Sequence, residues 1–127
     1  MDDFSSDIDQ RLHTAYRNTS YRILPARINI RIGEPNHALN EMLIDNNVFH
    51  WAFIAAVNPK SIRLSPNENQ QRHDSLCAIL RKQAYAFCEG LGIGDDAQWP
   101  PEQSVFVMDI DQHQCQDLHR KHRPAFA

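Results

Sequence analysis

The chain of 127 residues has the length of one domain, enough to bury a hydrophobic core without disulfides or metals. It is 42% hydrophobic and 23% charged, the usual range for a globular protein, which excludes a disordered or fibrous chain. No apolar run approaches the roughly 20 residues that span a bilayer, and the acidic N-terminus does not resemble a secretory signal. Three widely spaced cysteines indicate reduced thiols. We therefore expect one soluble cytoplasmic domain over residues 1–127, with residues 1–6 flexible and no membrane partner.

The net charge of −3 hides an asymmetry along the chain. Between residues 11 and 33 there are five arginines and no acid: Arg11, Arg17, Arg22, Arg27 and Arg31. Such a stretch could meet phosphate or an acidic partner, although a solvated strand face balanced by acids elsewhere is the simpler interpretation. The acidic balance of the whole chain argues against nucleic acid as a partner.

In the first half of the chain, apolar spacing predicts a helix over residues 7–18 and an extended segment over residues 21–24. From Arg27 to Ile32 the residues alternate strictly, which predicts a half-buried strand. Its isoleucines should face the core, and Arg27, Asn29 and Arg31 should face solvent. After a turn, Asn36 should cap a second helix that ends near Asn46–Asn47.

In the second half, the run from His50 to Val57 is apolar on both alternating faces and predicts a central strand. Ser65, Pro66 and Glu68 form a capping box with proline at the first helical position, so a helix should run to about Lys82. Two strands are expected over residues 85–87 and 105–110, followed by a helix over 111–122 and a short edge strand over 125–127. This irregular order favours an α+β domain with a mixed or antiparallel sheet and about four helices.

Several short motifs occur in a specific order. The run FIAAVNPKS at residues 53–61 is followed by Leu64–Ser65 and by ENQQR at residues 68–72. The opening AYRNTSY at residues 15–21 and WPPEQS at residues 99–104 complete the pattern. Together they resemble the bacterial family called domain of unknown function 3293, over roughly residues 12–127. The resemblance implies a compact single domain and assigns no activity.

The helix that begins after Ser65 suggests a ligand site. At about 100° per residue, Asn69 and His73 share a stripe with Leu76 and Leu80, so the stripe is polar only in its first turns and should line a cleft there. A helix N-terminus favours anions, so an anionic small molecule, such as a nucleotide or phosphate ester, is the expected ligand. The site would comprise Asn58, Lys60, Ser61, Asn69, Arg72, Trp99 and Glu102. Alternatively, Ser65 and Glu68 only cap the helix, Asn69 and His73 bond to a loop, and nothing binds.

Catalysis is left open by the sequence. Glu102 is a weak candidate for a general acid or base, because a carboxyl desolvated beside Trp99 would have a raised pKa; a surface position is equally consistent. The glycine run at residues 90–94 does not open a helix, so it predicts a flexible hairpin loop, not a dinucleotide site, and no cofactor is expected. Asp95 and Asp96 are a weak signal for a hard cation.

Two further interpretations concern metals and partners. Cys115, His119 and His122 lie on one face of the last predicted helix, like half of a zinc site, but Leu118 shares that face, so packing is favoured and no metal is expected. Cys77 and Cys88 fall on predicted core faces, so neither is a convincing nucleophile. As an alternative function, the Arg22–Arg31 strand face could bind a protein partner in a non-catalytic interaction module.

Overall fold

The computed structural model describes residues 19–24, 28–58, 62–95 and 100–121, without the side chains of residues 119 and 121. Within these ranges, five strands form one curled antiparallel sheet in the order β2-β1-β4-β5-β3. The strands are β1 (Thr19–Ile23), β2 (Ile28–Ile30), β3 (Trp51–Ile54), β4 (Phe87–Gly94) and β5 (Glu102–Met108). The helices of the described residues are α2 (His37–Asp45), α3 (Pro66–Lys82) and α4 (Gln112–Lys121). The α+β class is confirmed, with an antiparallel sheet.

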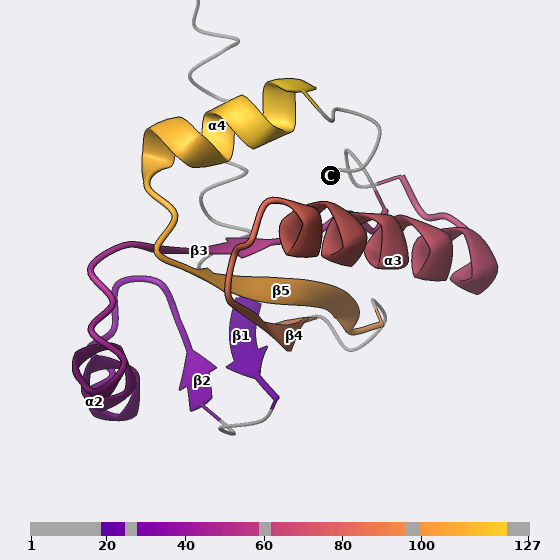
Figure 1. Ribbon diagram of the computed structural model, residues 1–127. Coiled ribbons are helices and arrows are strands. Elements are labelled where there is room, and N and C mark those ends of the chain that lie inside the picture. The colour runs from indigo at the N-terminus through magenta and orange to yellow at the C-terminus, as the bar shows by residue number, and fades with distance from the viewer. Residues whose placement is uncertain (1–18, 25–27, 59–61, 96–99, 122–127) are drawn as a thin grey trace, which may run out of the picture.

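Helices cover the two faces of the sheet unequally (Figure 1). On one face, α3 and α4 pack over β3, β4 and β5 around a core that includes Leu76, Leu80 and Val105. On the other face, α2 lies beside β2, where Leu39 joins a second core with Ile23 and Phe106. Adjacent residues of β5 therefore point into different cores, as the pleat requires. No helix of the described residues is long and apolar enough to cross a membrane.

The predicted helix boundaries agree with the structure where it describes them. Ser65 Oγ accepts the backbone N–H of Glu68, and the Glu68 carboxylate accepts the backbone N–H of Ser65, which completes the capping box. Asn36 caps α2 through Leu39, and Asn47 takes the left-handed conformation after it, with φ of 56°. Three helices are described where about four were predicted. The expected helix over residues 7–18 and the edge strand over residues 125–127 lie outside the described residues.

The prediction of a central strand at His50–Val57 is wrong. Among the described residues, β3 is only four residues long and lies at an edge of the sheet, where β5 is its one neighbour. Trp51 is 36% exposed, and burial becomes complete only beyond the strand, at Ala56. An apolar run favours burial on both faces, but it cannot show whether a second neighbour pairs with the strand.

The predicted strand Arg27–Ile32 is shorter than expected. Ile28 and Ile30 are buried, as predicted, but Ile32 is 43% exposed because β2 ends at Ile30 and the chain turns at Gly33, whose φ is +84°. Arg31 bridges Glu34 and Asp95. Arg27 lies outside the described residues.

The predicted flexible glycine loop is also wrong, because residues 90–94 belong to β4, where all five pair with β1 and residues 90–92 also pair with β5. Gly90 is required there by close packing. A Cβ at this position would lie 2.6 Å from Cζ of Phe53 and 2.7 Å from the backbone oxygen of Arg22. Glycine is thus needed at this position because neighbouring atoms lie close to the strand, and not because a loop must be flexible.

A groove of about 450 Å³ lies between β3 and the start of α4, lined by residues that include Phe49, Trp51, Ile110 and Cys115. Of the residues that the sequence predicted to bind a ligand, none of the four that the structure describes lines this groove.

Candidate functional site

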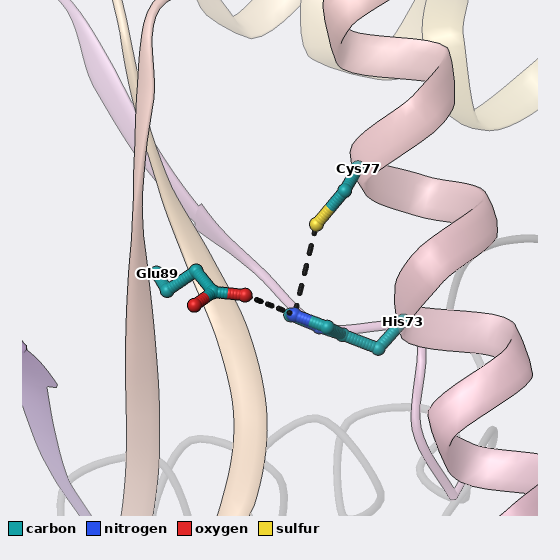
Figure 2. Close-up of side chains that lie close together, drawn as sticks. All are labelled: His73, Cys77 and Glu89. Carbon is teal, nitrogen blue, oxygen red and sulfur yellow. Dashed lines mark hydrogen bonds and ion pairs between the residues drawn. The ribbon is translucent and has the colours of Figure 1, made fainter.

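Three side chains with metal-binding chemistry meet between α3 and β4 (Figure 2). His73 and Cys77 are four residues apart on α3, so their side chains lie on the same face of the helix. That face packs against the sheet, leaving His73 2% and Cys77 4% exposed. Glu89 comes from β4, two residues after Phe87, which packs on the α3 side of the sheet. Because side chains alternate along a strand, Glu89 also faces α3.

Both the carboxylate and the thiol approach the same ring nitrogen. Glu89 Oε1 lies 3.1 Å and Cys77 Sγ 3.6 Å from His73 Nε2. The three ligand atoms all lie within 4.8 Å of one another. The side chain of Glu89 is 63% exposed, so the cluster has one wet side and one buried side.

One imidazole nitrogen cannot form good hydrogen bonds with both neighbours. If Nε2 carries the proton, it donates a hydrogen bond to the Glu89 carboxylate. It then has no free lone pair to accept a hydrogen bond from the Cys77 thiol. If Nε2 is bare, it can accept from the thiol, but its lone pair then faces an ionised carboxylate oxygen at 3.1 Å. A cation shared by the three atoms would satisfy all of them.

The arrangement does not fit a Cys–His–Glu catalytic relay. In such a relay the nucleophile bonds to one ring nitrogen and the carboxylate orients the other. Here both neighbours lie at Nε2, whereas the buried Nδ1 has no hydrogen-bond partner within the described ranges. Burial, and secondarily the charge of Glu89, raises the pKa of the Cys77 thiol. A protonated thiol is a poor nucleophile, which also argues against covalent catalysis.

Three of the seven predicted site residues meet in a second polar cluster at the N-terminal end of α3. Asn58 and Asn69 exchange hydrogen bonds of 2.9 Å, and Asn58 Nδ2 donates to Glu102 Oε2 at 2.7 Å. Asn58 is 6% exposed and has a φ of 44°, and its Oδ1 also accepts the backbone N–H of Leu64. This network joins the loop after β3, the first turn of α3 and the start of β5.

Of the other four predicted site residues, the structure describes Arg72. Arg72 Nε donates to the backbone oxygen of Ala56. Lys60, Ser61 and Trp99 lie outside the described residues, so the structure does not place them relative to Asn58 or Glu102.

Among the remaining residues that the sequence raised as metal ligands, the structure describes Asp95 and Cys115. Asp95 bonds to Arg31, whose guanidinium lowers the pKa of the Asp95 carboxyl, and Asp96 lies outside the described residues. Cys115 packs against the core beside α3, and its burial raises the pKa of the thiol. The side chain of His119 and all of His122 lie outside the described residues.

The cluster of His73, Cys77 and Glu89 was not predicted. The spacing of His73 and Cys77 was visible in the sequence, and His73 was recognised as a polar interruption of an apolar stripe. Glu89 was missed because the glycines that follow it were assigned to a loop. Only the pairing of β4 with β5 brings Glu89 opposite α3.

Comparisons with known proteins give one match. The family model described as "Protein of unknown function (DUF3293)" matches residues 54–124, more than half of the chain. This range contains all three residues of the cluster. No curated protein and no solved structure matches the chain. The chain therefore belongs to the DUF3293 family of proteins of unknown function.

Proposed function

We propose that the protein binds one divalent metal ion of the zinc class through His73, Cys77 and Glu89. The observation that carries this proposal is the approach of Cys77 Sγ and Glu89 Oε1 to the same nitrogen, His73 Nε2, at 3.6 and 3.1 Å. A cation would replace the proton for which these three atoms compete.

Two of the three separations between the ligand atoms, those made by His73 Nε2, fit a tetrahedral ion. With Zn–S of about 2.3 Å and Zn–N of about 2.0 Å, the tetrahedral angle separates sulfur and nitrogen by about 3.5 Å. With Zn–O of about 2.0 Å, nitrogen and oxygen are separated by about 3.3 Å. The observed separations, 3.6 and 3.1 Å, are within a few tenths of an ångström of these values.

The chemical types of the ligands narrow the choice of metal. Imidazole and thiolate suit zinc and its neighbours in the first transition row, whereas calcium and magnesium require oxygen ligands. Mixed nitrogen, sulfur and oxygen coordination is within the ordinary repertoire of zinc.

Titration of metal-free protein with cobalt(II) tests the proposal, because a cobalt–thiolate bond gives a charge-transfer band in the near ultraviolet. We expect one cobalt per chain and a sulfur band, both lost on addition of one equivalent of zinc. Cys77→Ser should abolish the band. It should weaken binding by more than the roughly 10–100-fold that loss of an outer-shell partner costs.

Matched variants separate this site from adventitious binding. Cys88→Ser removes a thiol on the adjacent residue of β4 that packs into the opposite core, and it should leave the titration unchanged. Glu89→Gln alters a mostly exposed side chain, so it should fold, keep the sulfur band and bind cobalt more weakly. Asp74→Asn, beside His73 but with its carboxylate bonded to Gln70, should have no effect. Equal binding by all four variants would refute the proposal.

The anionic-ligand site and the interaction module remain predictions, and we rank both below the metal site. The Glu68 carboxylate already occupies the N-terminus of α3, and Glu102 adds a second negative charge at the polar cluster. Both charges disfavour an anion there. On the proposed interaction face, Arg31 is engaged by Glu34 and Asp95, which reduces the charge available to an acidic partner.

A further inference from the structure

We infer that the metal keeps one coordination position open to solvent, and that this position takes a small uncharged oxygen or nitrogen donor. The inference rests on the proposed function and goes beyond it, because a bound metal could equally be closed off by four protein ligands. The distinction separates a structural metal from one that performs chemistry.

The number of ligands supports an open position. The cluster formed by the described residues supplies one nitrogen, one sulfur and one carboxylate oxygen. Zinc in structural sites has four protein ligands, whereas zinc in catalytic sites has three and an exchangeable water or substrate. With Glu89 binding through one oxygen, a tetrahedral ion at this cluster would have one position that none of the described residues fills.

The burial of the three ligands shows from which side an external ligand would reach the open coordination position. His73 and Cys77 are 2% and 4% exposed, so the helix side of the cluster is closed. The side chain of Glu89 is 63% exposed and reaches from β4 toward the imidazole (Figure 2). An external ligand would therefore enter beside Glu89, without displacing core side chains.

The charge of the ligands selects the type of donor. A thiolate and a carboxylate together carry two negative charges, which neutralise a divalent ion. A neutral centre gains little electrostatic energy from an anion. Uncharged donors such as water, a carbonyl oxygen or an imidazole are therefore favoured. A metal with such a position can polarise a carbonyl or activate a water.

The visible spectrum of cobalt-loaded wild-type protein tests this inference, because its bands report the ligands of the metal. Imidazole, added at a pH where it is neutral, should shift these bands saturably while the sulfur band persists and cobalt stays bound. Inorganic phosphate at the same concentration should cause no shift. Asp74→Asn protein should respond as wild type does.

The possible failures are distinguishable. Protein that binds no cobalt overturns the metal site and this inference together. Bound cobalt whose spectrum ignores imidazole overturns only the open position and indicates a fourth protein ligand. A shift caused equally by phosphate overturns the preference for uncharged donors. Loss of the sulfur band with imidazole would mean that imidazole displaces Cys77, and it also counts against the inference.

Discussion

Replacing Gly90 by alanine should destabilise the protein through a clash that the structure locates. The added Cβ would lie 2.6 Å from Cζ of Phe53 and 2.7 Å from the backbone oxygen of Arg22, whereas comfortable contacts between carbon atoms are about 3.5–4.0 Å. Phe53 could rotate away, but the oxygen of Arg22 belongs to the paired strand β1 and cannot. Overpacking of this kind costs about 1–3 kcal/mol, from which about 0.5–1 kcal/mol is recovered because alanine has less backbone entropy to lose.

Gly92→Ala provides the matched control on the same strand. The nearest atoms to its added Cβ lie 4.0 Å away, so it should be neutral or stabilise by up to about 1 kcal/mol. Urea unfolding followed by circular dichroism measures the unfolding free energy of both variants. The melting temperature should fall by about 3–5 °C for each kcal/mol lost in a chain of this length. The reasoning is refuted if Gly90→Ala proves as stable as Gly92→Ala.

Three further predictions follow from single positions. Burial raises the pKa of the Cys77 thiol, so below that pKa metal binding must release the thiol proton. Metal affinity, measured by chelator competition, should therefore rise about tenfold per pH unit. An affinity that does not change with pH would exclude Cys77 as a ligand. Ala84 follows α3 with a φ of 62°, so Ala84→Gly should raise the unfolding free energy by about 1 kcal/mol, and a loss in urea unfolding would contradict this. Ser104 Oγ is buried with no partner among the described residues, so Ser104→Ala should be neutral or slightly stabilising; a loss above about 1 kcal/mol would reveal a hydrogen bond.

Local signals predicted the helices well, because their ends depend on short-range contacts. Ser65 and Glu68 cap α3 through atoms within one turn, and Asn36 caps α2 in the same way. Asn47 adopts the left-handed conformation that asparagine tolerates best among residues with side chains. Such features can be read from adjacent residues without knowledge of the fold.

The arrangement of strands could not be read in this way. The apolar run that contains β3 predicted a covered central strand, but its position at the sheet edge depends on partners far along the chain. Gly90 looked like a loop residue because the reason for its small size, the ring of Phe53, is 37 residues away in the sequence. Ile32 continued the alternation of β2, yet the turn at Gly33 removed it from the sheet.

The difference between short-range and long-range contacts also explains which parts of the candidate sites the sequence predicted. The contacts of Asn58 with Asn69 and Glu102 lie among residues that the sequence had singled out together. The metal cluster needs His73 and Cys77, which one helix brings together, and also Glu89, which only the sheet brings to them. A metal site that draws on two elements becomes visible only once their packing is known.

X-ray absorption of zinc-loaded protein tests the central claim most directly, because it counts the sulfur atoms around the metal. We predict a single sulfur at about 2.3 Å, with nitrogen and oxygen ligands at about 2.0 Å. In Cys77→Ser protein that sulfur should be absent. A wild-type zinc site without sulfur, or one that keeps its sulfur in Cys77→Ser protein, would contradict the assignment of His73, Cys77 and Glu89.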